Sequence, residues 1–322
     1  MTYAKIIGTG SYLPEKILTN NDLEKMVDTT AQWIYERTGV EQRHVAAPDE
    51  TTCDMAEIAA RRALEMADVD PASVDLIVLA TTTPDHIFPS VASQLQHRLG
   101  IYGCAAFDVQ AVCTGFVYAL SVADKFIRTG DANRVLVIGA ETFTRILDWS
   151  DRSTCILFGD GAGAVLLQAV DEPGIISSHL HSDGRYKELL WVPAGVSQGY
   201  DKTQQNAAYV HMRGNEVFKV AVNTLVRIVD ETLEANGLSI DDIDWLVPHQ
   251  ANTRILAATA KRLRLPMHKV INTVAQHANT SAASVPLALD VGIRDERIKR
   301  GELLLLEAFG GGFTWGSVLL RY

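Results

Sequence analysis

Short apolar runs alternate along the chain with longer segments in which apolar residues recur every three or four positions. The runs lie in VDLIVLATTTPD (74–85), NRVLVIGAET (133–142), IDWLVPHQAN (243–252) and GELLLLEAFG (301–310). Continuous apolar runs of this length are typical of strands buried on both faces, and the longer periodicity predicts amphipathic helices. The pattern therefore predicts an α/β protein.

Three of the helical segments carry start or stop signals. TTCDMAEIAARRALEMA (51–67) begins with threonines that can cap a helix, and NEVFKVAVNTLVRIVDETLEANG (215–237) closes on Asn236-Gly237, a good C-terminal stop. CTGFVYALSVADKFIRTG (113–130) forms one apolar stripe and ends near Gly130; the stripe consists of Phe116, Ala119, Leu120, Ala123 and Ile127. We therefore expect Cys113 at the amino end of a helix.

The order of the predicted elements recurs in the second half of the chain. Segment 74–85 is echoed by 243–252, 108–120 by 273–285, 133–142 by 301–310 and 159–167 by 313–320. Asp75 and Asn133 are 58 positions apart, and the corresponding Asp244 and Gly301 are 57 positions apart. Although any α/β chain shows loosely similar periods, we interpret this order as a duplication with halves at 1–172 and 173–322.

A duplicated α/β unit has a consequence for function. Loops at the carboxyl ends of equivalent strands tend to collect at one place, where such sheets bind ligands. Cys113, His249 and Asn279 stand at such ends, and Asn279 lies in the segment that echoes the Cys113 turn. We therefore expect these three side chains to meet.

Each of the three residues has a chemical and a structural interpretation. The N–H groups and dipole at a helix start favour the thiolate of Cys113, the nucleophilic form, whereas most free cysteines are buried structural thiols. His249, directly after a buried strand, fits an acid–base group or hydrogen-bond donor, or else a satisfied structural group. The Asn279 amide can donate to a developing oxyanion, or it can stabilise a turn.

Glycine-rich segments give one further candidate and one rejection. In EAFGGGFTWGS, the glycines 310–312 either allow backbone N–H groups to face a ligand oxygen or form a flexible hinge. GDGAGA (159–164) precedes a strand-like run and is a poor dinucleotide fingerprint. The chain contains neither G-x-S-x-G nor G-x-x-x-x-G-K-[ST].

Composition narrows the function classes. The 322 residues are 47% hydrophobic and 21% charged, enough for a large core in one or two domains. A net charge of −10 argues against general binding to nucleic acid or an anionic membrane, and no apolar run is long enough to span a bilayer. The first residues lack the layout of a signal peptide. The four cysteines lack C-x-x-C spacing, so they predict free thiols rather than a metal site. Together these features predict a cytoplasmic protein.

Four segments resemble bacterial β-ketoacyl-acyl-carrier-protein synthase III, a condensing enzyme of the thiolase-fold superfamily. They are QAVCTGF, WLVPHQANTRIL, HANTSAASVP and LLLEAFGGGFTWGS, and the resemblance extends over essentially the whole chain. It implies two pseudo-equivalent halves in a five-layer αβαβα arrangement, a homodimer, and acyl-CoA and acyl carrier protein as substrate and partner. It implies no metal or redox cofactor.

The resemblance also implies a reaction, a ping-pong Claisen condensation that initiates fatty-acid synthesis. The Cys113 thiolate would take an acyl group from acyl-CoA, with acetyl-CoA the first expectation. Malonyl-acyl carrier protein would then lose CO₂ while His249 and Asn279 stabilise the enolate, and the N–H groups of Cys113 and Gly311 would form the oxyanion hole.

Further residues are assigned by the same resemblance. The expected CoA and pantetheine contacts are Thr29, Trp33, Arg37, Arg152, Gly214, Phe218 and Asn252. The expected walls of the acyl pocket are Phe88, Phe143, Phe158, Leu190 and Phe309. In a plainer interpretation, Trp33 is a core residue and the two arginines are solvated. Val112 before the nucleophile is bulkier than the small residue that the family often has there.

The segment NTRILAATAKRLRL (252–265) predicts a helix with an apolar stripe, and basic side chains occupy the rest of its surface. A basic face in an acidic chain fits steering of the acidic carrier protein, although most charged helix faces are simply solvated. The expected carrier-protein contacts are Gln250, Arg254, Lys261, Arg262, Lys219 and Arg213.

Rival interpretations differ in how well the residues fit. A thiolase needs a second cysteine near the carboxyl end, but the last cysteine is Cys155, and elongating synthases carry a second histidine where this chain has Asn279. A related condensing enzyme of secondary metabolism, making quinolones or polyketide starters, keeps the same three residues and stays open. The intact Cys113 and His249 argue against an inactive carrier-protein-binding homologue.

Overall fold

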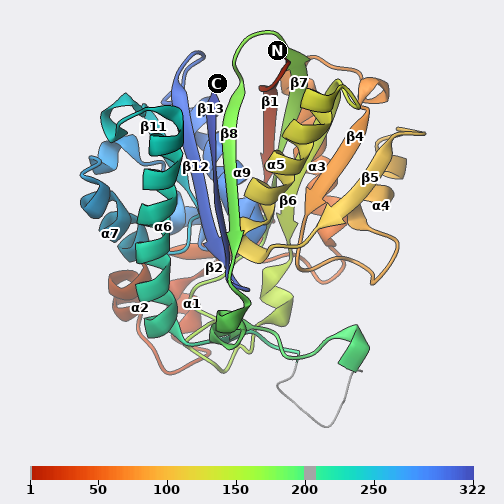
Figure 1. Ribbon diagram of the computed structural model, residues 1–322. Helices are drawn as coiled ribbons and strands as arrows, with labels where there is room; N and C mark the ends of the chain where they lie inside the picture. The colour runs from red at the N-terminus through yellow and green to blue at the C-terminus, as the bar shows by residue number, and fades with distance from the viewer. Residues whose placement is uncertain (1, 199–207) are drawn as a thin grey trace.

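Two mixed β-sheets form the framework of the computed structural model, which describes residues 2–198 and 208–322 (Figure 1). The first sheet has the order β1-β7-β6-β4-β5, with β1 (Tyr3–Tyr12), β4 (Leu76–Ala80), β5 (Ala105–Val109), β6 (Arg134–Glu141) and β7 (Gly161–Val170). The second has the order β11-β12-β13-β8, with β8 (Ile175–Ser182), β11 (Trp245–Pro248), β12 (Leu303–Gly310) and β13 (Thr314–Arg321). Two small sheets pair β2 (Ile17–Thr19) with β3 (Gln42–His44), and β9 (Leu190–Trp191) with β10 (His211–Met212).

Helices cover and separate the two sheets. Helices α5 (Gly115–Thr129) and α9 (Ser284–Arg294) lie between the sheets, where their apolar faces share one core with both. Helices α3 (Thr52–Ala67) and α4 (Val91–Arg98) cover the outer face of the first sheet, and α6 (Gly214–Asn236) and α7 (Thr253–Leu263) that of the second. The predicted five-layer αβαβα arrangement is therefore confirmed. Short helices are α1 (Asn20–Leu23), α2 (Ala31–Thr38) and α8 (Val274–His277).

The two sheets have corresponding topologies. In each, a parallel pair (β4 with β6, β11 with β12) is followed by an antiparallel strand (β7, β13) and then a second one (β1, β8). The edge strand β5 pairs in parallel with β4, and an isolated parallel bridge from Leu246 in β11 to Val270 takes the corresponding place. The repeated sequence segments thus lie on equivalent strands.

The helix ends follow the predicted signals. Thr51 caps α3, where its hydroxyl accepts a hydrogen bond from Asp54 N and the Asp54 carboxylate accepts one in return from Thr51 N. Helices α5 and α6 end on Gly130 and Gly237, with φ of 83° and 65°, a conformation that glycine adopts at low cost. All three predictions are confirmed.

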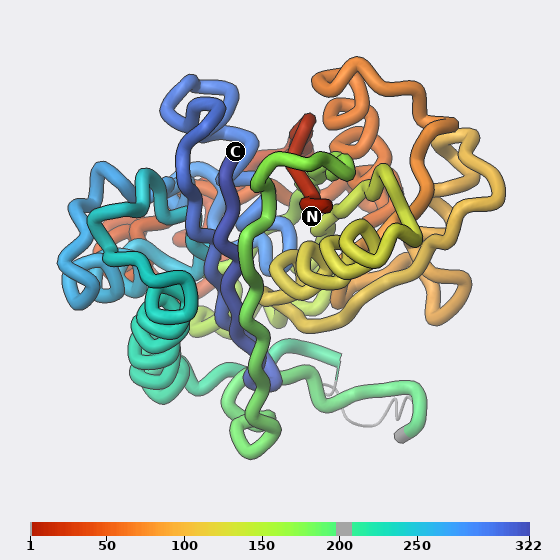
Figure 2. Tube along the Cα trace, turned by 45° about the horizontal axis from the view of Figure 1, so that its top comes forward, coloured from red at the N-terminus to blue at the C-terminus, as the bar shows by residue number. Residues whose placement is uncertain are grey.

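Figure 2 shows the two chain ends on the same side of the molecule. In the described ranges, no helix is long and apolar enough to cross a membrane.

Candidate active site

A cavity of about 600 Å³ runs from the surface to a buried point between the two halves. Its inner end is lined by Cys113, His249 and Asn279, which are only 3%, 5% and 6% exposed. Its outer part is lined by the exposed side chains of Arg37 and Arg254, among others. The structure therefore brings the three expected residues to one place that small molecules can reach.

Cys113 lies in a 3-10 turn, Val112–Thr114, immediately before α5. Hydrogen bonds tie this turn to the second half: Thr314 Oγ1 donates to Ala111 O and Thr114 Oγ1 donates to Thr314 O, both at 3.0 Å. Val112 has a φ of 49°, which is strained for a β-branched residue. Such strain is held in place by surrounding contacts, and it turns Cys113 toward the cavity end.

Burial dominates the electrostatics of the thiol. It raises the pKa of Cys113 to about 12, while a hydrogen bond with Ser281 lowers it and the nearby Glu141 carboxylate raises it further. Burial therefore opposes the thiolate form of Cys113, which the helix start favours.

His249 follows β11 and is held by its backbone and its ring. Its N–H donates to Glu307 O at 2.8 Å, and its Nδ1 lies 2.6 Å from Ser284 Oγ. Burial lowers the pKa of His249 to about 3, so the imidazole is neutral at pH 7. Gln250 N donates to Ser284 Oγ at 3.4 Å. We therefore assign the hydroxyl hydrogen to the bond with Nδ1, which leaves the ring proton on Nε2 as a donor.

Asn279 is oriented by its neighbours. Its Oδ1 accepts a hydrogen bond from Ser281 N at 2.9 Å, and its backbone N–H and C=O pair with Leu157 and Gly159. Because the amide oxygen is engaged, the Nδ2 group is the part of the side chain suited to donate to a ligand.

The glycine run packs against the nucleophile turn. A Cβ placed on Gly310 would lie 2.8 Å from Cys113 N and 2.9 Å from Cys113 Cβ, closer than a side chain allows. Gly311 follows and is buried against Leu190. The close approach of the two backbones therefore requires a glycine at position 310, a reason that neither interpretation of the run had included.

The cavity mouth carries an aromatic ring with two cations close to it. The Trp33 ring has the Arg37 guanidinium 5.5 Å from its centroid and that of Arg152 at 5.1 Å. Arg152 also donates to Asp28 O at 2.8 Å. Such a stack fits a flat, electron-rich ligand group.

The other expected CoA contacts divide into two groups. Gly214, Phe218 and Asn252 line the cavity, and Asn252 also caps α7 by accepting from Ile255 N. Thr29 does not line the cavity, and its buried hydroxyl has no hydrogen-bond partner among the described residues.

The expected acyl-pocket residues are placed at different depths. Phe158, Leu190 and Phe309 line the cavity, and Phe143 stacks behind Phe158 with ring centroids 4.4 Å apart. Phe88 does not line the cavity of its own chain: it lies in the segment between β4 and α4, and it is 83% exposed. The sequence analysis missed eight apolar lining residues, because nothing in the sequence distinguishes them from core residues: Ile156, Leu157, Met212, Val217, Ala221, Leu225, Ala251 and Ile255.

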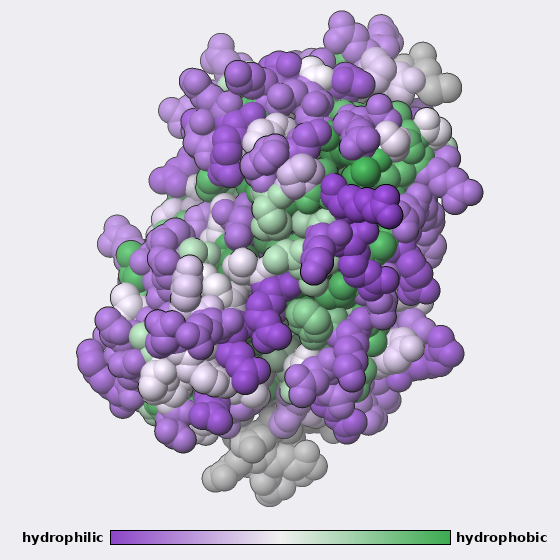
Figure 3. Space-filling view, turned by 90° about the vertical axis from the view of Figure 1, so that its left-hand side faces the viewer, coloured by the Kyte–Doolittle hydropathy of each residue, from purple (hydrophilic) through white to green (hydrophobic). Residues whose placement is uncertain are grey.

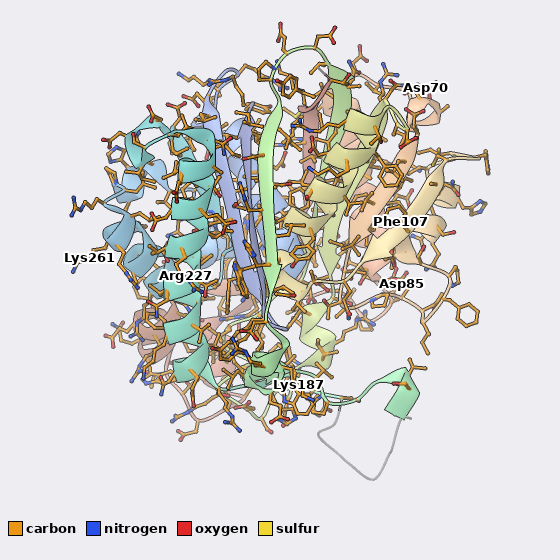
Figure 4. The ribbon with its side chains drawn as sticks, in the orientation of Figure 1. Asp70, Asp85, Phe107, Lys187, Arg227 and Lys261 are labelled. Atoms are coloured by element: carbon orange, nitrogen blue, oxygen red, sulfur yellow. The ribbon has the colours of Figure 1, made fainter. Side chains whose placement is uncertain are left out.

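A basic surface adjoins the mouth. Five of the expected carrier-protein contacts are exposed on or next to α6 and α7: Arg213, Lys219, Arg254, Lys261 and Arg262. Figure 3 views the molecule from this side, where hydrophilic side chains cover most of the surface, and Figure 4 shows Lys261 extending from α7 away from the sheets.

Gln250 corrects the prediction for that surface. The residue is fully buried, its Nε2 donates to Pro248 O and Ile271 O, and its Oε1 accepts from Thr273 N. Its side chain bridges β11 to the segment before α8 and cannot contact a carrier protein. No sequence pattern indicates this burial, because the residue stands between the His249 turn and a surface helix.

A thiol at the end of a cavity can hold an acyl group as a thioester, and neutral donors beside it can stabilise an enolate. Such a site on αβαβα layers belongs to the condensing acyltransferases of the thiolase fold. A sequence model of the 3-oxoacyl-[acyl-carrier-protein] synthase III family matches residues 107–184, and a model of its C-terminal part matches 233–322. The chain belongs to this β-ketoacyl-acyl-carrier-protein synthase III family of fatty-acid biosynthesis.

Relatives resemble the chain over its full length. The β-ketoacyl-[acyl-carrier-protein] synthase III of Thioalkalivibrio sulfidiphilus is 67% identical over 100% of both chains. The crystal structure of 3-oxoacyl-[acyl-carrier-protein] synthase III from Aquifex aeolicus has a TM-score of 0.93 at 46% identity and covers 99% of this chain and 100% of its own. A priming β-ketosynthase from the R1128 polyketide biosynthetic pathway has a TM-score of 0.95 at 37% identity, covering 99% and 96%.

Proposed function

We propose that the protein condenses an acyl-CoA, with acetyl-CoA as the first choice, with malonyl-acyl carrier protein through a thioester on Cys113. The observation that carries this proposal is the meeting of Cys113, His249 and Asn279 at the inner end of one cavity. The reaction uses these side chains and backbone groups and requires no metal or redox cofactor. It takes place in the cytoplasm, in keeping with the free thiols of all four cysteines.

Acylation is the first half-reaction. The Cys113 sulfur attacks the thioester carbonyl of acyl-CoA, a carbon–sulfur bond forms, and CoA leaves as its thiolate. The N–H groups of Cys113 and Gly311 stabilise the oxyanion, and one such donor typically contributes about 3 kcal/mol. Packing of Gly310 against Cys113 supports this assignment, because it brings the glycine backbone to the reacting atoms.

Decarboxylation and condensation follow. His249 Nε2 and Asn279 Nδ2 donate to the thioester oxygen of the malonyl group and stabilise the enolate that forms as CO₂ leaves. The enolate carbon attacks the acyl carbonyl, and the Cys113 thiolate is released. A neutral imidazole suits this role because it donates a hydrogen bond without giving up its proton.

The binding roles follow the cavity. Trp33 stacks on the adenine of CoA, with Arg37 and Arg152 nearby, and the pantetheine arm passes Gly214, Phe218 and Asn252. The acyl chain ends against Phe158, Leu190 and Phe309, with Phe143 behind them.

The acidic carrier protein docks on the basic surface of α6 and α7. Charge reversal at Arg254 and Lys261 is expected to raise the KM for malonyl-acyl carrier protein and to leave that for acyl-CoA unchanged. Lys299→Glu, an exposed reversal outside this surface, is the matched control. Equal changes of both KM values would contradict the assignment.

The protein acts as a homodimer of chains with two duplicated halves that join in the turn between β7 and β8. Strand β5 is the edge strand of its sheet, and Figure 4 shows Phe107 on it. Exposed apolar side chains lie near this edge, namely Ile87, Phe88 and Tyr102. Unpaired edges and exposed apolar groups favour association. A molecular mass of twice the chain mass in sedimentation equilibrium would support the dimer, and the mass of a single chain would contradict it.

A primer screen tests the function. The purified protein is given acetyl-CoA, longer or branched acyl-CoA, and aromatic primers, with malonyl-acyl carrier protein or malonyl-CoA as second substrate. Preference for acetyl-CoA and the carrier-bound substrate supports the proposal. The likeness to the priming β-ketosynthase favours a starter-unit condensation of secondary metabolism as the second candidate. Preference for a specialised primer would select it, and no product with any pair would contradict both.

A further inference from the structure

Arg43 is a buried arginine that the proposed mechanism does not use. It is the central residue of β3, and it is fully buried. Arginine is rarely buried to this extent unless it is paired with a carboxylate. The guanidinium of Arg43 instead donates four hydrogen bonds to neutral oxygens: to Leu18 O at 3.1 Å, to Asn20 Oδ1 at 3.0 Å from each Nη, and to Ile156 O at 2.9 Å. Burying a charge without a counter-ion is costly, so this position calls for a specific role.

The bond to Ile156 O joins two segments that lie far apart in the sequence. Burial lowers the pKa of Arg43 to about 10, so the guanidinium keeps its charge at pH 7. Hydrogen bonds from a charged donor are shorter and stronger than those between neutral groups, and exclusion of water strengthens them further. Arg43 Nη2 therefore fixes the main chain at Ile156, where the segment 156–158 begins to line the cavity.

The segment 156–159, which this bond holds, also holds the backbone of Asn279. Leu157 O accepts a hydrogen bond from Asn279 N at 2.9 Å, and Gly159 N donates one to Asn279 O at 3.0 Å. Between them, Phe158 forms an isolated parallel β-bridge with Asn279. A shift of this segment therefore moves the backbone of Asn279 and, with it, the amide group at the inner end of the cavity.

Strand β3 also contacts helix α8, which comes directly before that amide in the sequence. Glu41 N, next to β3, donates to Ala275 O at 2.9 Å. The three segments meet at Gly159, where a Cβ would lie 3.1 Å from both Arg43 Cβ and His277 O. So close a packing leaves little room for one segment to move without the others.

We propose that Arg43 is a positioning residue for Asn279: it fixes the segment 156–159 and thereby aims the Asn279 amide at the thioester oxygen of the malonyl group. The inference rests on the proposed function, in which Asn279 Nδ2 donates to the enolate. It also accounts for the choice of arginine, because a planar fork with two Nη groups can bind acceptors on several segments at once, whereas a single ammonium cannot hold them in the same geometry.

Two variants test the role of the fork. Arg43→Lys keeps the charge but cannot reproduce all four hydrogen bonds, and Arg43→Met removes every donor. Misplacing a group at the reacting centre by about 1 Å can cost about a hundredfold in rate, so decarboxylation should slow about tenfold in Arg43→Lys and about a hundredfold in Arg43→Met. Acylation does not use Asn279 and should stay within about threefold of the wild type.

The assay keeps misfolding apart from misplacement. Each variant is first acetylated by acetyl-CoA, and the acetylated Cys113 is quantified by mass spectrometry. Release of CO₂ from malonyl-acyl carrier protein is then expressed per acetylated chain, so that chains without a folded site do not count. If Arg43→Met does not fold, the conservative Arg43→Lys carries the test.

Asn279→Ala provides the comparison that a merely structural role would not satisfy. Removing the amide should slow decarboxylation by about a hundredfold or more. If Arg43 acts through the amide, adding Arg43→Lys to Asn279→Ala should slow the reaction no further, whereas independent effects would multiply. Arg300→Lys is the matched control, because Arg300 also donates to backbone carbonyls, those of Ile6 and Ile7, but on β1. This control should leave both half-reactions unchanged.

The outcomes separate this inference from the proposed function. Unchanged decarboxylation in Arg43→Lys, equal slowing of both half-reactions, multiplied effects in the double variant, or the same slowing in Arg300→Lys would each overturn the role of Arg43 and leave the proposed function in place. Unchanged decarboxylation in Asn279→Ala would contradict the proposed function of that amide and, with it, the role of Arg43.

Discussion

Ser284 offers a sharp test of the role of the imidazole. In Ser284→Ala the hydroxyl that lies 2.6 Å from His249 Nδ1 is lost, while the ring stays buried. Without this hydroxyl, no hydrogen bond at Nδ1 stabilises the tautomer that carries its proton on Nε2. The population of His249 that can donate from Nε2 to the malonyl oxygen therefore falls. The variant should therefore slow the second half-reaction.

The magnitude follows from the burial of both groups. Ser284 and His249 are 1% and 5% exposed, so removing the hydroxyl leaves a buried ring nitrogen unpaired, at a cost of about 1–3 kcal/mol. If this cost adds to the activation free energy of decarboxylation, condensation slows by roughly five- to 150-fold. Acylation of Cys113 by acetyl-CoA does not involve His249 and should keep its rate.

The two half-reactions are measured separately. Acylation is followed by single-turnover transfer from acetyl-CoA, and decarboxylation by CO₂ release from malonyl-acyl carrier protein on the preformed acyl-enzyme. Ser317→Ala is the control, since it removes a buried serine hydroxyl that bonds to Thr232 at 2.6 Å between β13 and α6. Decarboxylation within twofold of the wild type, or a parallel fall of both half-reactions, would refute the reasoning.

Three further changes test other parts of the account. Trp33→Ala should raise the KM for acetyl-CoA roughly five- to 150-fold with little change in kcat, because stacking on a base contributes about 1–3 kcal/mol; an unchanged KM would exclude the stack. Gly310→Ala should slow acylation about a hundredfold, because its Cβ would lie 2.8 Å from Cys113 N, whereas Gly184→Ala, whose Cβ meets nothing within 4 Å, should be silent. Burial raises the pKa of Glu307 from 4.5 to about 8, so the unfolded chain ionises first and native stability falls as pH rises across that window. Glu307→Gln removes this loss, and urea unfolding should show its advantage over the wild type growing from pH 5 to 8; a constant difference would contradict the assignment.

Much of the fold could be predicted because its signals are local. Apolar runs gave β4, β6, β11 and β12, and the caps of α3 and α6 mark their ends as expected. The repeat order predicted a duplication, and the structure contains two sheets of corresponding topology. These features depend on residues within or next to each element, so they can be predicted from the sequence.

The rest depends on contacts that form only in the folded chain. The thiolate at Cys113 was predicted from the helix start alone, but burial has the larger effect on its pKa. Gln250 could not be told from a surface residue before the packing of β11 was known. Ser284 belongs to no sequence pattern with a chemical meaning, since its contact with His249 joins two distant segments.

The central claim is that Cys113 carries the acyl group. Mass spectrometry of peptides after incubation with acetyl-CoA, without the malonyl substrate, tests it most directly. The account predicts one acetyl group on the peptide containing Cys113, none on Cys53, Cys104 or Cys155, and none at all in Cys113→Ala. An unmodified Cys113, or an acetyl group on another cysteine, would contradict it.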